Sequence, residues 1–322
     1  MTGNSSFNQA KLAKNDEFYT LYSDVEQELS HYSEHLQGKV ILCNCNDGED
    51  SAFWQYFSRN FEALQLAKLI GLKYGENAHV LEMTRPRQIL KTFLDGDGDF
   101  RSAESIELLK TADVVVTNPP FSCFRAYLAQ LFAYEKRFLV MGNMNMIVCR
   151  EVFPYFRDGR LLLGHHILKN FARPDGSLQK FLNVFWFTNL PTELHHEPLS
   201  LTARYAPERY PHFDNIPAID VGSVAEIPCD FDGLMGVPVS YLRHYNPEQF
   251  EVVGVTNGCE LAFKQYRNPL MHHPDGRVVN GSKLNSTAVI RVREKPDGVY
   301  YTADNAEGYL LSRFARLLIR RK

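Results

Sequence analysis

The sequence lacks any apolar run of the roughly 20 residues that a membrane-spanning helix requires, and its first 15 residues lack the hydrophobic centre of a signal peptide. We therefore expect no contact with a membrane and a cytoplasmic location. A strong charge of one sign is also missing. The net charge of −3 argues mildly against a nucleic-acid partner, although such an average can hide a basic face.

Metal-binding and disulfide patterns are absent too. The six cysteines have neither zinc-site spacing nor the density of a small disulfide-bonded scaffold, so reduced thiols in a cytosolic compartment are the simplest interpretation. They are Cys43, Cys45, Cys123, Cys149, Cys229 and Cys259. The histidine pairs at 165–166, 195–196 and 272–273 have no acidic or cysteine partner at zinc spacing. The aspartates of 95–99 resemble a calcium loop, but Phe100 stands where that loop needs glycine. We predict no metal site.

What the chain does contain is enough apolar residues, 44% of the total, for a sizeable core in two domains. Residues 1–15 are polar and without periodicity, and we predict a flexible N-terminal tail there. From residue 16 to residue 190, helical and buried-strand patterns alternate, which predicts an α/β domain with a doubly wound sheet. Beyond it, repeated prolines break any helix and short β-like pieces follow. This predicts a boundary at 190 and a smaller mixed α+β domain over 191–322.

Hydrophobic spacing gives the individual elements of the first domain. Helices are predicted at 24–36, 51–64, 105–112, 124–134 and 151–156, and strands at 38–46, 66–74, 112–118, 136–143, 160–166 and 181–189. The stretch 78–94 is less regular and is interpreted as an insertion carrying one strand.

The stretch TADVVVTNPPFSCF, residues 111–124, joins a buried strand to two prolines. The three valines leave no side for water, which is typical of the middle of a parallel sheet. The prolines cannot donate to a strand ladder, so they end it and hold the carbonyls of Asn118 and Pro119 pointing away from the sheet. Those oxygens need a donor from outside. We predict an amino group on a nucleobase, with Phe121 as the surface on which the base lies.

Ligands in open α/β sheets bind at the carboxyl ends of the strands, so the loops at 43–48, 96–100 and 118–121 are expected to line one crevice. The segment 16–20 would clamp a small charged molecule from the side. The chemistry that fits is methyl transfer from S-adenosylmethionine to an exocyclic amine, whose lone pair is delocalised into the ring. Two carbonyl acceptors turn that lone pair toward the methyl group, so no strong general base is required. A base in a duplex must first leave the stack.

Four stretches together resemble the EcoRI-type adenine-specific DNA methyltransferases: KNDEFYT, VILCNCNDGEDSAFWQYF, GDGDFRSAESIELLKTADVVVTNPPF and GLMGVPVSYLRHYNPEQFEVVG. The terminal FARLLIRRK is a weaker echo. The resemblance implies a Rossmann-like seven-stranded methyltransferase sheet, with S-adenosylmethionine as cofactor. It also implies the N6 amino group of a flipped-out adenine in double-stranded DNA as acceptor, and a C-terminal target-recognition domain.

The resemblance also implies particular site residues. Cofactor contacts are expected from Phe18, Tyr19, Thr20, Cys43, Asn44, Asp47, Asp99, Phe100 and Asn118, and Asn118, Pro119, Pro120 and Phe121 form the catalytic tetrapeptide. Phe121 would stack on the target base, and Trp186 stands where related enzymes carry a second aromatic near it. The glycine-rich cofactor loop usual in methyltransferases is absent between Val40 and Gly48. Side-chain contacts from Asn44 and Asp47 are expected to replace it.

Alternatives stay open at this stage. The same tetrapeptide type serves methylation of RNA bases or of a protein glutamine, and an inactive DNA-binding module is a further alternative. We expect a monomer that acts on double-stranded DNA, and a cognate restriction endonuclease acting on the same site is a candidate partner. Two groups of basic residues either contact DNA or are ordinary solvated charges: Lys264, Arg267, Arg277 and Lys283, and the arginines of 313–322. The recognised DNA sequence is not predictable from these residues.

Overall fold

The computed structural model describes residues 19–45, 47–173, 177–192, 198–257 and 264–322. The chain divides into two compact units, one over Met1–Met146 and Arg160–Thr192 and the other over Ile147–Gly159 and Glu193–Lys322. The segment Ile147–Gly159 falls within the range predicted for the first domain, yet it groups with the second unit. In this segment, the ring of Phe156 in helix α7 (Phe153–Arg157) packs against that of Tyr245, with the ring centroids 5.7 Å apart. None of the described helices has the length and apolarity to cross a bilayer.

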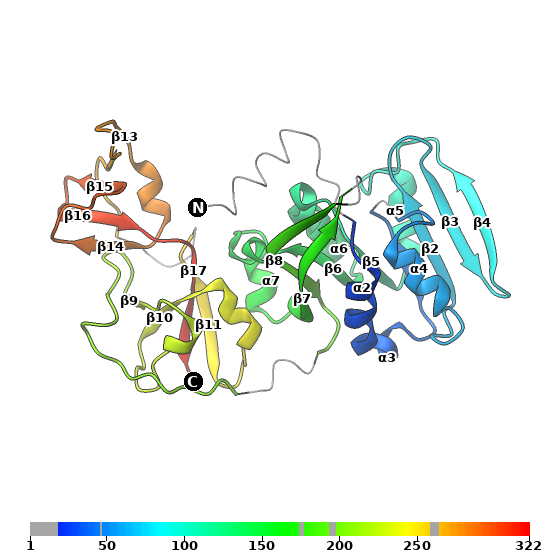
Figure 1. Ribbon diagram of the computed structural model, residues 1–322, viewed down its shortest axis with the longest axis horizontal. Helices are drawn as coiled ribbons and strands as arrows, with labels where there is room; N and C mark the ends of the chain where they lie inside the picture. The colour runs from blue at the N-terminus through cyan, green and yellow to red at the C-terminus, as the bar shows by residue number, and fades with distance from the viewer. Residues whose placement is uncertain (1–18, 46, 174–176, 193–197, 258–263) are drawn as a thin grey trace. The chain divides into compact units, whose positions relative to one another are not determined.

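The first unit is built on a mixed sheet of eight strands in the order β4-β3-β2-β1-β5-β6-β8-β7 (Figure 1). The strands are β1 Val40–Cys43, β2 Lys68–Lys73, β3 His79–Thr84, β4 Gln88–Phe93, β5 Val114–Thr117, β6 Arg137–Asn143, β7 Leu162–Ala172 and β8 Leu178–Thr188. The four central strands, β2, β1, β5 and β6, pair in parallel with one another. Antiparallel pairs flank them, β3 and β4 on one side and β8 and β7 on the other. The predicted α/β class is therefore confirmed, with eight strands where seven were expected.

The additional strand arises at residues 78–94, where one strand was expected and a hairpin of β3 and β4 forms. All six residues of β4 are exposed. A strand that is exposed on both faces has no reason to alternate apolar and polar side chains, so its sequence carries no strand period. The hairpin extends the sheet beyond β2.

Helices pack against this sheet largely where the sequence predicted them. They are α2 Tyr22–Leu29, α3 Ser33–Leu36, α4 Ala52–Arg59, α5 Ala103–Thr111 and α6 Phe124–Ala133. The Ser51 hydroxyl caps α4 by accepting a hydrogen bond from the Phe53 amide at 3.1 Å. This helix ends five residues before the predicted position 64, but Phe61 and Leu64 remain buried in the core.

A buried carboxylate fixes the N-terminal part of the unit. Glu28 of α2 is fully buried and accepts hydrogen bonds from the backbone amides of His165 and His166 in β7, each at 2.8 Å. Nδ1 of His166 lies 2.9 Å from the same carboxylate. A buried charge is tolerated only with such partners. They hold α2, and with it the segment 19–21 that precedes it, against β7.

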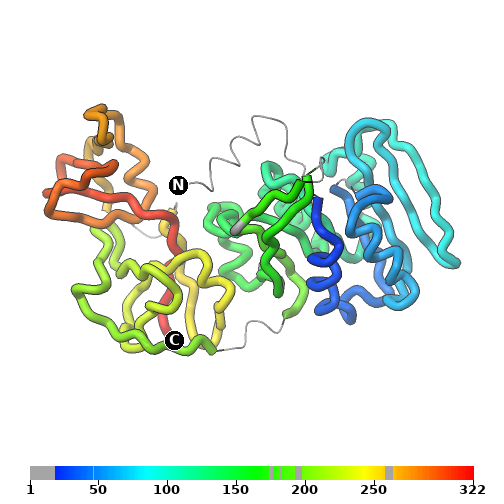
Figure 2. The backbone as a smooth tube through the Cα atoms, viewed as in Figure 1, coloured from blue at the N-terminus to red at the C-terminus, as the bar shows by residue number. Residues whose placement is uncertain are grey.

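The second unit contains a four-stranded sheet, β11-β17-β10-β9, and a five-stranded sheet, β13-β12-β15-β16-β14. Its strands are β9 Ala218–Asp220, β10 Leu234–Pro238, β11 Phe250–Val255, β12 Leu270–His272, β13 Val278–Asn280, β14 Val289–Val292, β15 Tyr300–Ala303, β16 Ala306–Ser312 and β17 Arg316–Arg321. The end of the chain, red in Figure 2, runs from β16 in one sheet into β17 in the other. Phe213, Ile290 and Leu318 share a core cluster, so the two sheets are packed together.

Candidate functional site

A cavity of about 860 Å³ lies in the first unit beside the carboxyl ends of β1, β2 and β5. Most of the predicted site residues line it, namely Tyr19, Thr20, Asn44, Asp47, Asp99, Phe100, Asn118, Pro119, Pro120 and Phe121. Loops that are far apart in the sequence therefore meet at one edge of the sheet, as the strand-end rule predicts. The predicted contact of Phe18 lies outside the described residues.

Two predicted site residues lie elsewhere and require a correction. The Cys43 side chain is fully buried in the core and does not line the cavity, whereas Cys45 does. Trp186 is also fully buried, and its ring packs edge-on against Phe53 with centroids 6.1 Å apart. A ring enclosed by the core presents no face to a nucleobase. The structure thus assigns Trp186 to packing and does not support the base-stacking prediction.

The Asn118–Phe121 turn follows β5 directly. Val114–Val116 are fully buried, as predicted, and Pro119 is buried behind them while Pro120 is exposed. The Pro120 carbonyl accepts a hydrogen bond from the Cys123 amide at 2.9 Å, which begins a short 3₁₀ turn. Among the described residues, no backbone amide donates to the Pro119 carbonyl. Pro119 itself lines the cavity.

Phe121 is half-buried and lines the cavity with part of its ring. Its edge contacts are Phe171 of β7, at 6.4 Å between centroids, and Phe181 of β8, at 6.1 Å. Both contacts are nearly perpendicular, which is a favourable geometry for aromatic pairs. The ring is consequently held in place at one wall of the cavity.

Asp47 connects the first loop of the cavity to the end of β5. Its carboxylate accepts the hydroxyl protons of Ser51 and Thr117, both at 2.6 Å, and the Cys45 amide at 3.1 Å. Burial raises the pKa of this carboxyl to about 6, and the hydrogen bonds oppose that rise. A Cβ at Gly71 would lie 2.6 Å from the Asp47 carbonyl oxygen, so only glycine lets β2 approach this loop. Asp47 therefore orients the site, and its oxygens are already occupied.

Asn44 offers a donor of a different kind. Its side chain is 2% exposed, and its Oδ1 accepts the hydroxyl proton of Tyr127 in α6 at 2.5 Å. The hydroxyl stays protonated, since burial raises the pKa of Tyr127 well above its ordinary value. The Asn44 Nδ2 has no hydrogen-bond partner within the described residues. A buried amide without a partner is costly, so this group fits a ligand acceptor in the cavity it lines.

Asp99 and Phe100 are accompanied by a residue that the sequence did not single out. The Arg101 guanidinium forms two hydrogen bonds with the Asp99 carboxylate, at 2.8 and 2.6 Å, and these lower the pKa of that carboxyl. Arg101 also lies 5.2 Å from the centre of the Phe100 ring. The salt bridge fixes a charged side chain above an aromatic wall of the cavity. Arg101 could have been predicted as a site residue, because it directly follows Asp99 and Phe100 in the sequence.

The segment ahead of α2 forms another wall. Tyr19 makes two backbone hydrogen bonds with Ala172 of β7, at 2.8 and 2.9 Å, and the Thr20 hydroxyl lies 3.4 Å from the Met141 sulfur. Several further lining residues were not predicted: Glu49, Asp50, Lys73, Tyr74, Ser122 and Cys123. They lie within three residues of a predicted site residue or at the end of β2. Lys73 and Tyr74 were missed because both fall inside the strand predicted at 66–74, whereas β2 ends at Lys73.

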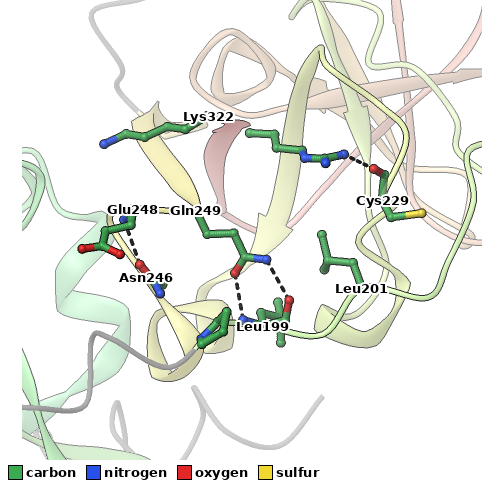
Figure 3. Close-up of a pocket in the computed structure, with 9 residues that line it drawn as sticks. Leu199, Leu201, Cys229, Asn246, Glu248, Gln249 and Lys322 are labelled. Atoms are coloured by element: carbon green, nitrogen blue, oxygen red, sulfur yellow. Dashed lines mark hydrogen bonds between the residues drawn. The ribbon is translucent and has the colours of Figure 1, made fainter.

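A second cavity, of about 510 Å³, lies in the second unit (Figure 3). The Gln249 side chain spans part of it, with Nε2 donating to the Leu199 carbonyl at 2.7 Å and Oε1 accepting the Leu199 amide at 2.8 Å. The Arg321 guanidinium donates to the Cys229 carbonyl. Its polar lining groups are thus largely committed to holding the chain together. It contains none of the predicted site residues.

Comparison with known proteins gives a consistent result. The family described as the adenine-specific methyltransferase EcoRI matches residues 6–90 and 79–322. The Type II methyltransferase M.EcoRI of Escherichia coli is 39% identical over 296 residues, covering 80% of this chain and 91% of that protein. M.MgeORF184P of Mycoplasma genitalium and M.MpnI of Mycoplasma pneumoniae are 40% and 38% identical over 313 residues, 89% of this chain and 99% and 98% of theirs. No solved structure matches the chain.

Proposed function

Because the chain belongs to the EcoRI family of adenine-specific methyltransferases, we propose that it transfers a methyl group from S-adenosylmethionine to the N6 amino group of a flipped-out adenine in double-stranded DNA. The observation that carries the proposal is that the Asn118–Phe121 turn and the loop after β1 line the same cavity. Methyl transfer requires the donor and the acceptor to be held side by side. One cavity with both sets of residues meets that requirement.

The acceptor side is formed by the tetrapeptide. The side-chain amide oxygen of Asn118 and the main-chain carbonyl oxygen of Pro119 accept the two hydrogens of the adenine amino group, which moves its nitrogen toward tetrahedral geometry. The lone pair then points away from the ring, and the proton is lost after the bond to carbon has formed. Phe121 stacks on the extruded base and offsets part of the unstacking cost, with a stacking contribution of about 1–3 kcal/mol per base. Its two aromatic neighbours keep it in position.

The cofactor side is formed by the other walls. S-adenosylmethionine supplies, when bound, a methyl group activated by a positively charged sulfur. The Asn44 Nδ2 donates to an acceptor of the cofactor, and the Phe100 ring contacts an apolar or aromatic part of it. Thr20 and Tyr19 close the cavity from the side, and Asp47 orients the loop after β1. These residues take the place of a glycine-rich loop.

Asn118→Ala tests the acceptor side. We expect methylation of DNA to fall by about 100-fold or more, because an interaction made in the transition state is lost. Cofactor affinity, measured by calorimetry without DNA, should change only a few-fold. Asn60→Ala is the matched control, since the side-chain amide of this residue, which directly follows α4, donates to the Tyr56 carbonyl at the end of that helix. Full activity of Asn118→Ala would exclude the proposed role.

The substrate class is tested by offering the chain one radiolabelled methyl donor with duplex DNA, RNA or protein. Label in duplex DNA supports the proposal, whereas label only in RNA or protein contradicts it. Modification-sensitive sequencing of DNA from cells that express the chain then reports the methylated base and its sequence context. We also propose that residues 191–322 recognise this context, as a target-recognition domain.

A further inference from the structure

Phe314 lies in the short connection between β16 and β17, and its side chain is 85% exposed. No other large hydrophobic side chain in the described ranges is as exposed, the next being Phe93 at 65%. Burying a phenylalanine stabilises the folded state, and this position forgoes that contribution. The neighbourhood of Phe314 shows that the exposure is not a consequence of a loose loop.

A single buried carboxylate fixes both sides of the ring. Asp220, which is 7% exposed, accepts a hydrogen bond from Nε of Arg316 at 3.0 Å through one oxygen and lies 3.1 Å from Nε of Arg313 through the other. The two arginines stand at positions −1 and +2 relative to Phe314. Two ion pairs with one buried partner restrict the chain between them. The connection is therefore anchored from within the unit.

The backbone is anchored at the same two places. The Arg313 amide donates to the Ala288 carbonyl at 2.8 Å, and the Arg316 amide donates to the Thr256 hydroxyl at 2.8 Å. The Thr256 amide in turn donates to the Arg316 carbonyl at 2.9 Å. Both ends of the tip, which joins β16 in one sheet to β17 in the other, are thus hydrogen-bonded. A tip held in this way presents its ring at little further entropic cost.

The charge beside the ring favours an anionic partner. Two arginines and one aspartate leave a local excess of one positive charge, and Arg313 is 42% exposed. A guanidinium has five N–H donors, and the ion pair described here uses the Nε–H of each arginine. Phosphates of a nucleic-acid backbone are attracted to such a site. An apolar ring between two arginines therefore matches a ligand with a charged backbone and flat apolar faces.

The size of the feature argues against a protein partner. A stable protein interface buries about 800 Å² on each side, far more than one phenyl ring can cover. A base stack, in contrast, can take up one flat ring completely, and phenylalanine wedges are inserted at base steps by DNA-bending proteins. We propose that Phe314 inserts between stacked bases of duplex DNA, positioned by Arg313 and Arg316. This inference rests on the proposed function and adds to it a DNA-deforming residue.

Phe314→Ala in the full chain is the direct test. Binding is measured with unmethylated plasmid fragments as the probe, and we expect affinity to fall about 5-fold to 150-fold, which corresponds to about 1–3 kcal/mol for one stacked base. The slope of affinity against salt concentration should stay the same, because no charge is removed. Thermal stability should be unchanged for a side chain that is 85% exposed. Phe314→Trp keeps a flat aromatic ring at this position and should bind DNA about as tightly as the wild type.

Insertion has a second signature that a general loss of affinity lacks. A ring inserted between base pairs unwinds the duplex, so the wild type should shift the topoisomer distribution of closed circular plasmid relaxed in its presence. Phe314→Ala, compared at equal occupancy, should not. Phe93→Ala is the matched control, because it removes another exposed phenyl ring, from β4 of the first unit.

The outcomes separate the two proposals. If the wild type methylates duplex DNA and Phe314→Ala binds and unwinds it equally well, the insertion of Phe314 is overturned and the proposed function stands. If the wild type neither binds nor methylates duplex DNA, both are overturned. Loss of binding and unwinding in Phe314→Ala alone, with methylation by the wild type, supports both.

Discussion

The two units of the molecule each contain an aspartate with little solvent exposure, and its partners differ in kind between the units. Asp47 in the first unit is 3% exposed and accepts hydrogen bonds from two hydroxyl groups and one backbone amide, all of them neutral. Burial disfavours the charged form, and these neutral donors compensate only in part. The pKa of Asp47 is consequently raised to about 6.

Asp214 in the second unit is 9% exposed at its side chain and is bound by cations. Lys264 Nζ and the Tyr266 hydroxyl each donate to it at 2.8 Å, and the Arg291 guanidinium donates to its other oxygen. Burial raises the pKa of this carboxyl, but the hydrogen bonds from Lys264, Tyr266 and Arg291 outweigh burial and lower it overall. This carboxylate remains charged at any pH near neutral.

The difference shows what each unit uses its acidic residue for. Asp47 orients the hydroxyl of Thr117, the residue just before the Asn118–Phe121 turn, and can change its protonation close to neutral pH. Asp214 and Asp220 each hold two basic side chains in place. Lys264, which the sequence left open between DNA contact and solvated charge, therefore has a structural partner. These basic residues of the second unit therefore have a role in its fold, whether or not they also contact DNA.

Among the substitutions that test this difference, Asp214→Asn is expected to change the free energy of unfolding most. It removes the charge that Lys264 and Arg291 share, so two cations lose their partner. Because these side chains are 35% and 43% exposed and can be rehydrated, we expect a loss of about 2 kcal/mol in the free energy of unfolding, less than for fully buried pairs. Urea titration of the full chain at pH 8 measures it.

Asp275→Asn is the control for this substitution. Asp275 lies 3.9 Å from Arg277, and both side chains are 63% exposed. A solvated pair of this kind contributes little, and we expect a change within about 0.5 kcal/mol. An equal effect of the two substitutions would mean that burial does not distinguish Asp214.

A smaller and pH-dependent effect is expected from Asp47→Asn. The folded-state pKa of Asp47 is above its unfolded value, so this residue contributes stability below the unfolded pKa, and that contribution is lost as the pH rises through about 6. Between pH 5 and pH 8 the loss amounts to about 1.4 kcal/mol, the equivalent of one pKa unit. Asparagine does not titrate. The stability of the variant relative to the wild type should therefore rise by that amount between the two pH values.

Asp214→Asn provides the contrast in the same experiment. The lowered pKa of Asp214 means that its contribution is present above the unfolded pKa and is lost only as the pH falls through the folded pKa. The gap between Asp214→Asn and the wild type should thus be the same at pH 5 and pH 8. If both variants showed the same pH dependence, the two carboxylates would not differ as described.

Several features of the site were predictable because their signals are local. The buried valines, the two prolines and Phe121 are consecutive in the chain, and their structure follows from strand burial and the missing amide protons. The strand ends meet at one edge because parallel strands require it. Most of the site residues that the sequence indicated therefore line the cavity.

The errors have a physical cause as well. Residues 185–187 are all buried, so both faces of β8 are covered and alternation gives no sign of which way Trp186 points. At the end of β1, a difference of one residue separates the core position of Cys43 from the cavity position of Asn44. The Asp214 cluster joins residues 50 to 77 positions apart, and no local pattern records such pairs.

The smallest effect, about 1 kcal/mol, concerns two buried tyrosines, one in each unit. The Tyr127 hydroxyl donates to Asn44, whereas the Tyr241 hydroxyl is buried without a hydrogen-bond partner in the described chain. Tyr127→Phe leaves the Asn44 oxygen unpaired and its amide free to rotate, so we expect the cofactor dissociation constant to rise about 5-fold. Tyr241→Phe removes the same atom and should leave both stability and cofactor affinity at least as high as in the wild type. Calorimetric titration of both variants with S-adenosylmethionine decides between them, because equal affinities would show that Tyr127 does not position Asn44.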